Sequence, residues 1–224
     1  IGLPVYNGEK YLEGALLSIL SQDYGDFELI VSDNASTDGT QLICENYARL
    51  DKRVRYSRNT ANIGAAPNHN RVFARAAGKF FKWAAHDDEC MPGMLGRCVE
   101  TLERAPTSVA LVYPQLLLID DQDTVIREDT LAYDVVSLDA RESRPHKRLA
   151  LILSRIVLGT PMYGIIRSEV LRKTRLIASF HTSDYVLLAE LAMLGHFWEI
   201  PEKLIRRRLH AGRSTAAHPT RKAL

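Results

Sequence analysis

Two adjacent carboxylates close an aromatic, apolar run in the first half of the chain. The run Phe80–Ala85 has the length and composition of a strand, and it leads through His86 to Asp87, Asp88 and Glu89. Adjacent carboxylates repel each other, so such a cluster requires a nearby cation or full solvation. Carboxylate oxygens suit hard divalent ions, and Mg²⁺ is commonly held by one or two carboxylates together with substrate phosphate oxygens. The alternative is an acidic turn that caps the next helix, and the cluster alone does not decide between the two.

The composition limits the classes of protein to consider. The chain has 224 residues, of which 46% are hydrophobic and 25% charged, enough for one large domain with a sizeable core. A formal net charge of +2 argues against nucleic-acid binding. The longest uncharged apolar stretch, Val109–Ile119, is too short to span a bilayer. Three cysteines without metal-ligand or redox spacing, and no recognisable signal peptide, favour the cytoplasm.

The hydrophobic periodicity alternates between strands and helices. Strands are predicted at 1–5, 27–31, 54–56, 80–85 and 109–119, and helices at 11–20, 38–50, 67–77, 94–102, 147–157 and 184–194. Asn7 and Asp38 are predicted to cap the first two helices. Strands that alternate with helices indicate an α/β fold with a largely parallel sheet, although the order is less clear after residue 120.

Polar residues follow three of the predicted strands. They are Asn7, Asp33 and the Asp87–Asp88 pair. Ligands of open α/β sheets bind outside the carboxyl ends of the strands, so we expect these side chains to share one site. The sequence has no GxGxxG and no GxxxxGK[ST] motif, and therefore lacks the glycine cradles that bind dinucleotides and nucleoside triphosphates. A nucleotide diphosphate would need a metal ion and basic side chains to neutralise its charge.

Five segments form an ordered set of motifs. They are Ile1–Glu9 (IGLPVYNGE), Glu28–Thr40 (ELIVSDNASTDGT), Asn59–Gly64, Asn70–Gly78 and Ala85–Pro92 (AHDDECMP). Their order and spacing resemble the family 2 glycosyltransferases, which are inverting enzymes with the Rossmann-like GT-A fold. The resemblance is strong over residues 1–120 and weaker beyond them. It implies one α/β domain, with a nucleotide-sugar-binding half at 1–120 and an acceptor-binding half with a basic C-terminal segment at 121–224.

The resemblance implies a set of donor-binding residues. Those that would line the nucleotide pocket or reach the nucleotide are Pro4, Tyr6, Glu9, Asp33, Asn62, Arg71 and Asp87. Asp33 would accept a hydrogen bond from the base, usually uracil, and its alternative role is to cap the turn after its strand. Asn62 and Arg71 fit an alternative role equally well, that of ordering their loop.

The resemblance also implies a metal ion, Mn²⁺ or Mg²⁺, held by Asp87 and Asp88. This segment lies where the family carries its Asp-x-Asp metal motif. One departure is Ala85, because many relatives have an aspartate at this position, and a ribose or metal contact is lost with it. His86 would either replace that contact or lie beside the acids as a hydrogen-bonded neighbour, and we favour the neighbour.

The general base is expected in the second half. An inverting transferase displaces the nucleoside diphosphate in one step, so a carboxylate must accept the proton of the attacking hydroxyl. Asp184 opens the predicted apolar helix 184–194 at the place where relatives carry this acid. An aspartate in a first helical turn also complements the helix dipole. We favour the catalytic role for Asp184.

Cations outnumber acids after Trp198. The segment Arg207–Ser214 resembles the loop that closes over the pyrophosphate in relatives, which implies that His210 or Arg213 binds the diphosphate or, for His210, the metal. Docking of this basic segment on anionic lipid and a simple solvated charge run are the alternatives.

These residues together predict a metal-dependent inverting glycosyltransferase. It would move a sugar from a nucleotide-diphosphate donor, expected to be a UDP-sugar, to a hydroxyl of a glycan, lipid-linked or small-molecule acceptor. Polysaccharide, cell-wall or other glycoconjugate synthesis at the inner face of the membrane fits this activity. A sugar nucleotidyltransferase is the first alternative, but Gly8-Glu9-Lys10 is too sparse for its glycine-rich basic loop. A catalytically impaired sugar-nucleotide or glycan-binding module is the second, because of Ala85.

Overall fold

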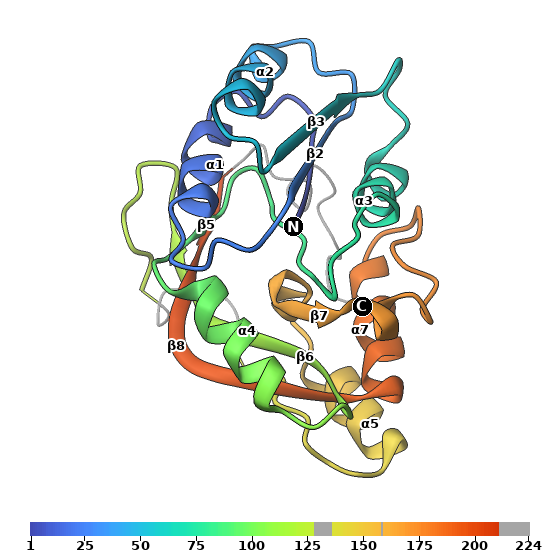
Figure 1. Ribbon diagram of the computed structural model, residues 1–224. Helices are drawn as coiled ribbons and strands as arrows, with labels where there is room; N and C mark the ends of the chain where they lie inside the picture. Colours follow the sequence, from blue (N-terminus) through green and yellow to red (C-terminus); the bar gives the residue numbers. More distant parts are fainter. Residues whose placement is uncertain (128–135, 158, 211–224) are drawn as a thin grey trace.

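The computed structural model describes residues 1–127, 136–157 and 159–210 (Figure 1). The first elements are β1 Gly2–Val5, α1 Leu12–Leu20, β2 Leu29–Asp33, α2 Thr40–Leu50, β3 Val54–Arg58 and α3 Ala65–Ala74. They are followed by β4 Phe80–Phe81, β5 Glu89–Cys90, α4 Met94–Arg104 and β6 Val109–Ile119. The later elements are α5 Pro145–Arg155, the 3₁₀ helix η2 Thr160–Tyr163, β7 Ile165–Arg167, α6 Ser168–Leu171, α7 Ser183–Leu194 and β8 His196–Arg208.

The first sheet is parallel and has the order β1-β2-β3. Its central strand β2 is buried throughout, and its side chains alternate between two apolar clusters because successive residues of a strand point to opposite faces. Leu29 and Val31 pack in the cluster that contains α1 and α2, whereas Ile30 packs in the cluster that contains α3. Figure 1 shows α1 and α2 on one side of these strands and α3 on the other.

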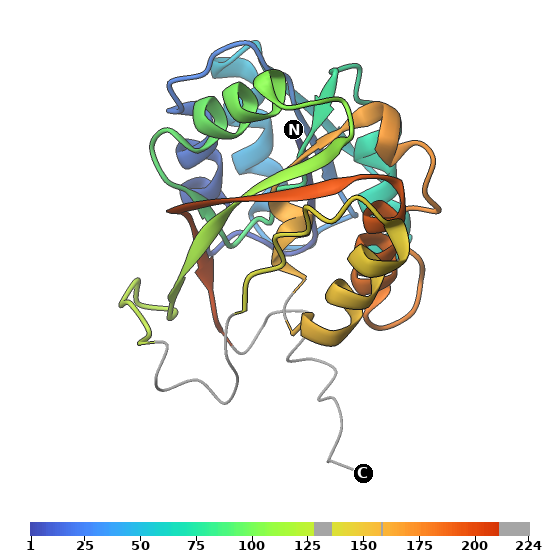
Figure 2. The same ribbon diagram turned by 90° about the horizontal axis from the view of Figure 1, so that it is seen from below.

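The second sheet is mixed and has the order β4-β7-β6-β8-β5. The long strands β6 and β8 pair in parallel from Val109 opposite His196 to Ile119 opposite Arg208, and the other pairs in this sheet are antiparallel. Helix α4 lies on one face, with α5 and α7 on the other (Figure 2). A Cβ atom at Gly195 would lie 2.7 Å from the carbonyl oxygen of Ser108, so glycine allows the chain to leave α7 and enter β8 against β6.

The α/β class and the order of elements over the first 120 residues are confirmed, with differences in detail. The predicted strand 80–85 pairs as β4 only at Phe80–Phe81. Beyond it the chain changes partner and joins β1, because Gly2 N donates to Lys82 O at 2.9 Å and Ala84 N donates to Gly2 O at 2.9 Å. The second sheet is mixed rather than largely parallel, since it includes the unpredicted strands β7 and β8.

The two predicted helix caps have different outcomes. Asn7 does not cap α1, which begins only at Leu12; instead, Asn7 has a positive φ of 51° and its Oδ1 accepts a hydrogen bond from Thr37 N at 2.8 Å. The N-cap residue of α2 is Gly39 rather than Asp38, but Asp38 Oδ1 accepts the N–H of Thr40, the first residue of the helix, at 3.0 Å. Within the described residues, no helix combines the length and apolar composition needed to cross a membrane.

Candidate functional site

The acidic pair Asp87–Asp88 follows residues 82–84, which pair with β1, and it lies against the end of β8. Asp87 Oδ2 lies 2.9 Å from His210 Nε2, and Asp88 Oδ1 accepts the backbone N–H of Arg208 at 2.9 Å. Burial and, to a smaller extent, the charge of Asp87 together raise the pKa of Asp88 to about 7, against the opposing charge of Arg207. The end of β8 therefore fixes Asp88, and His210, two residues beyond β8, contacts Asp87.

The donor set of this pair fits a metal ion that is shared with a ligand. In the described part of the chain, no cluster of three or more His, Cys, Asp and Glu side chains is arranged to hold a metal. A divalent ion at Asp87 and Asp88 would therefore need further oxygen ligands, and Mg²⁺ commonly takes these from substrate phosphates. A divalent ion at the pair would favour the ionised form of Asp88, against the burial and the charge of Asp87 that raise its pKa.

Asp184 lies in the first turn of α7, after Thr182, which has a positive φ of 63°. Burial raises the pKa of Asp184, while the N–H groups of Asp184 and Tyr185 and the charge of Arg207 favour its ionised form. Its carboxylate packs directly against the backbone before η2, because a Cβ atom at Gly159 would lie only 2.1 Å from Asp184 Oδ2. This aspartate is thus held between a helix start and a glycine.

The structure brings Asp184 and the acidic pair into one site. The guanidinium of Arg207 on β8 acts on the pKa values of both Asp88 and Asp184, and its Nη1 donates to Thr160 Oγ1 at 3.1 Å. Tyr163, at the end of η2, lies within electrostatic reach of the same three carboxylates and of Arg207. The buried ammonium of Lys82 donates to the carbonyl oxygen of Tyr163 at 2.5 Å and so joins η2 to the acidic segment.

The predicted base-binding residue Asp33 is completely buried at the end of β2. Its Oδ1 accepts the N–H of Ser36 at 2.9 Å, and its Oδ2 accepts hydrogen bonds from Tyr56 Oη at 3.0 Å and Arg58 Nε at 3.1 Å. The turn-capping role proposed as the alternative is therefore present in the structure. The contact between Asp33 and a base stays a prediction.

The remaining predicted donor residues surround the carboxyl ends of the first sheet. Pro4 is buried in β1, Tyr6 is 45% exposed, and Glu9 Oε2 accepts the N–H of Gly39 at 3.0 Å. Asn62 orders its own loop, because its Oδ1 accepts hydrogen bonds from Asn34 Nδ2 at 2.8 Å and from Gly64 N at 2.9 Å.

The three further predicted residues are Arg71, His86 and Arg213. Arg71 on α3 has a buried Nε atom without a hydrogen-bond partner among the described residues. The ring of His86 packs against Gly8, where an added Cβ would lie 2.8 Å from His86 Cδ2. Arg213 lies outside the described residues.

Comparison with known proteins then decides the family. The sequence profile of Glycosyl transferase family 2 matches residues 1–173. The chain belongs to glycosyl transferase family 2. It is 25% identical over 219 residues to an uncharacterised glycosyltransferase of Haemophilus influenzae, covering 95% of this chain and 66% of that protein.

Two solved structures share the fold of this family 2 domain. TarS residues 1–349 of S. aureus in complex with UDP-GlcNAc matches with a TM-score of 0.75 and 18% identity over 98% of this chain and 60% of that one. The mannosyltransferase PcManGT of Pyrobaculum calidifontis in complex with GDP-Man and Mn²⁺ matches with a TM-score of 0.67 and 18% identity over 96% and 58%. The chain thus spans less than two thirds of the length of these relatives, and the match establishes the GT-A fold.

Sequence reasoning about this family 2 domain missed four residues of the site. They are Lys82, Gly159, Tyr163 and Arg207, which contact or act electrostatically on the predicted carboxylates. Strand β8 was not predicted. The sequence alone therefore did not indicate that Arg207 points to the opposite face of the sheet from Arg206 and Arg208. The glycine before η2 carries no signal in the sequence, because its importance depends on the approach of a side chain that lies 25 positions away along the chain.

Proposed function

We propose that this family 2 domain is a metal-dependent inverting glycosyltransferase that uses a nucleotide-diphosphate sugar. One observation carries the proposal. The Asp87–Asp88 pair and Asp184 both lie within electrostatic reach of Tyr163, and Arg207 acts on Asp88 and Asp184. The pair suits a metal ion that is shared with a diphosphate, and Asp184 suits a general base. A metal-dependent transferase that inverts the anomeric configuration needs both in a single site.

The geometry supports a single displacement with Asp184 as the base. The acceptor hydroxyl attacks the anomeric carbon, its proton passes to the carboxylate of Asp184, and the bond from that carbon to the diphosphate breaks with its electron pair on the phosphate oxygen. Burial raises the pKa of Asp184, which makes its carboxylate a better proton acceptor than an exposed one. Asp87 and Asp88 would hold the metal ion, and His210 contacts Asp87. When bound, the ion would supply positive charge to the diphosphate.

Similarity to solved structures supports the class of donor. The S. aureus structure contains UDP-GlcNAc, and the P. calidifontis structure contains GDP-Man together with Mn²⁺. We propose a UDP-sugar for this chain, with Mn²⁺ or Mg²⁺, bound mainly by residues 1–120. The acceptor, held by residues after 120, would be a glycan, a lipid-linked molecule or a small molecule in polysaccharide, cell-wall or other glycoconjugate synthesis. A location in the cytoplasm or at the inner face of the membrane belongs to the same proposal.

A donor screen tests the proposed function. UDP and GDP, and sugars attached to each, are added to the protein with Mn²⁺, with Mg²⁺ or with EDTA, and the melting temperature is measured. Metal-dependent stabilisation by UDP and its sugars is expected, followed by sugar transfer or donor hydrolysis with the opposite anomeric configuration in the product. The proposal is refuted if no nucleotide diphosphate raises the melting temperature with any metal, and its inverting part is refuted by retention of configuration.

Ala85 favours a second candidate, the catalytically impaired binding module. This residue stands beside the acidic segment without a side chain that can contact ribose or metal. The same screen separates the two functions, because an impaired module would bind the donor with a metal but neither transfer nor hydrolyse the sugar.

A further inference from the structure

Helix α5, Pro145–Arg155, packs one of its faces against the rest of the fold. Ile152 is completely buried in the apolar cluster that contains residues of α7, and Arg148 Nε donates to the carbonyl oxygen of Ala192 in α7 at 2.7 Å. The opposite face is exposed to solvent. We call it the outer face of α5, and the helical period brings its three residues into one line: His146, Ala150 and Leu153.

The start of α5 carries an unusual set of charges. Arg144, Lys147 and Arg148 lie at or just before its first turn, which contains no acidic residue. The N-terminal end of a helix has a partial positive charge, so cations are unfavourable there. Carbonyl oxygens compensate Arg148, whereas Arg144 and Lys147 are exposed, and no carboxylate of the described residues forms an ion pair with either. The charges of these two side chains thus suit an anion outside the protein.

Apolar side chains lie between these cations and a further one, Arg155. Leu153 is 61% exposed, and Val157, just beyond the helix, is 39% exposed. A single exposed leucine is ordinary in a globular protein. Exposed apolar side chains in a helix that has cations near both ends and no acid are instead typical of a helix that lies in the headgroup region of a membrane. There the apolar groups enter the acyl boundary and the cations meet the lipid phosphates.

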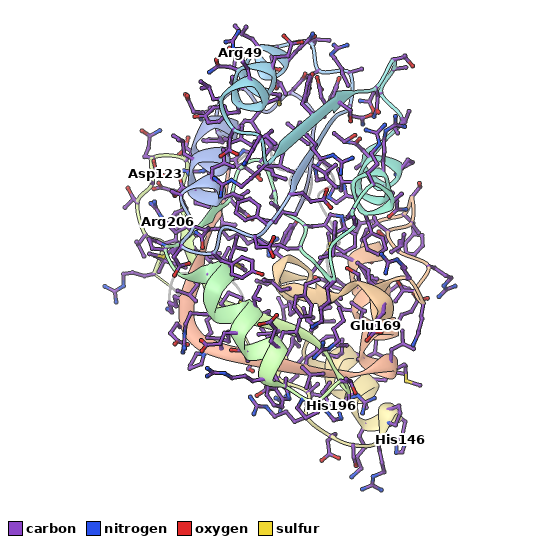
Figure 3. All side chains as sticks on the ribbon, in the orientation of Figure 1. Arg49, Asp123, His146, Glu169, His196 and Arg206 are labelled. Atoms are coloured by element: carbon purple, nitrogen blue, oxygen red, sulfur yellow. The ribbon has the colours of Figure 1, made fainter. Side chains whose placement is uncertain are left out.

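The outer face of α5 belongs to a surface at one end of the molecule, beside the proposed base. Tyr185 Oη donates to the carbonyl oxygen of Val157, and Tyr185 directly follows Asp184 in α7. Figure 3 shows His146 on α5 at the outer edge of the molecule, at the opposite end from Arg49 on α2. A flat surface that contacts α5 is therefore close to the segment that carries Asp184 and remote from α2.

We propose that the outer face of α5 docks the protein on an anionic membrane surface. Leu153 and Val157 insert among the lipid headgroups, while Arg144, Lys147 and Arg155 bind the lipid phosphates. This surface is separate from the basic segment after Trp198. The docking does not require enzymatic activity, but its consequence for catalysis rests on the proposed function: the base would lie near the bilayer, where a lipid-linked acceptor presents its hydroxyl.

The test measures the binding of the full chain to vesicles, without nucleotide or metal. Vesicles of phosphatidylcholine, alone or with about one quarter phosphatidylglycerol, are sedimented with each variant at low and at high salt. The wild type is expected to bind the phosphatidylglycerol vesicles, to lose most of this binding at high salt, and to bind phosphatidylcholine alone weakly. Lys147→Gln should weaken binding by about fivefold, the usual effect of one cation at an anionic surface. Leu153→Gln should weaken it by about fivefold or more, because an apolar anchor is lost.

Exposed residues of α2 supply matched controls at the other end of the molecule. Leu42 is 73% exposed and Arg49 is exposed, so Leu42→Gln and Arg49→Gln remove the same kinds of side chain from a surface that does not meet the membrane. Both controls should bind vesicles within about twofold of the wild type. The melting temperatures of all four variants should stay close to that of the wild type, because exposed side chains contribute little to stability.

Each contrary result overturns the proposal in a recognisable way. Absence of wild-type binding to phosphatidylglycerol vesicles would refute docking, and a dimer in solution that Leu153→Gln dissociates would assign the outer face to a second copy of the chain. Wild-type binding by both Lys147→Gln and Leu153→Gln would move the contact to another surface, such as the basic segment after Trp198. An equal loss in the α2 controls would show a general effect of charge or apolar area. Failure of UDP and GDP to bind with any metal would overturn the proposed function and leave the vesicle result unchanged.

Discussion

Gly159 offers a test of the base that leaves Asp184 itself unchanged. Gly159 has a φ of −68°, so it is not in the left-handed conformation that favours glycine over alanine. A Cβ atom placed there would lie 2.1 Å from Asp184 Oδ2, whereas an ordinary contact begins at 3.4 Å. The carboxylate in a Gly159→Ala variant must therefore move by about 1.3 Å, which it can do by rotating its side chain.

The expected effect follows from that displacement. A misplacement of about 1 Å in a catalytic group can cost ~10²-fold in rate, so we expect kcat to fall by ~10²-fold in Gly159→Ala. Donor affinity should change little, because the proposed donor contacts lie mainly in residues 1–120. The melting temperature should also stay close to that of the wild type, since replacing glycine by alanine in a compatible conformation restricts the unfolded chain and contributes ~0.4–1 kcal/mol of stability.

The assay is steady-state sugar transfer with donor and acceptor varied separately, beside a melting curve. Gly25→Ala is the matched control, because a Cβ atom at Gly25 meets nothing within 4 Å. A Gly159→Ala variant with the kcat of the wild type would refute the reasoning: the carboxylate would have moved without consequence, and Asp184 would not be the base. A large loss of donor affinity would instead place Gly159 and Asp184 in donor binding.

Four further predictions concern the carboxylates. Asp184→Asn should lower kcat by ~10²–10⁴-fold with donor binding nearly intact, whereas a residue that only caps α7 would tolerate asparagine, as turnover and a melting curve together will show. Asp88→Asn should keep the fold but weaken the Mn²⁺-dependent binding of UDP, and unchanged affinity in calorimetry would contradict its role as a ligand. Because burial raises the pKa of Asp184, kcat/KM should fall, as the pH is lowered, at a pH above the ordinary aspartate pKa of about 3.9. The same shift makes the free energy of unfolding decrease as the pH rises from that ordinary value through the raised pKa, and a pH series of melting curves should show this slope reduced in Asp184→Asn.

The first half of the fold could be predicted because its elements are buried in regular patterns. Leu12, Ala15, Leu16 and Ile19 form the buried stripe of α1, and the strands β2 and β6 are apolar runs of the expected length. The acidic pair was predicted as a site from adjacent carboxylates at the end of a predicted strand, and Asp184 from the place where the resembling family carries its general base. Their meeting in one site could not be derived from these local patterns, since it depends on how the two halves pack.

The strands of the second half were harder to predict because charged residues interrupt their apolar pattern. The burial of β8 is irregular along His196–Arg208, and its arginines are the residues that solvated segments also contain. Pairing with β6 makes a strand of this segment, and ion pairs with Glu89 and Asp123 compensate two of its cations. Such compensation arises from residues more than 80 positions away, which a local pattern does not include.

Residues of strand β8 lie near both the acidic pair and Asp184. Its backbone N–H at Arg208 holds Asp88, the residue His210 just beyond it contacts Asp87, and Arg207 lies within electrostatic reach of Asp88 and Asp184. Because β8 directly follows α7, a shift of the strand would move the helix that carries Asp184 as well as the contacts of the acidic pair. In the proposed function, the residues that fix the acidic pair and the residue that accepts the proton of the acceptor thus lie on one continuous segment, Ser183–His210. We expect substitutions that loosen the pairing of β6 with β8 to reduce donor binding and turnover together, in contrast to changes at Asp184 or Gly159, which should reduce turnover alone.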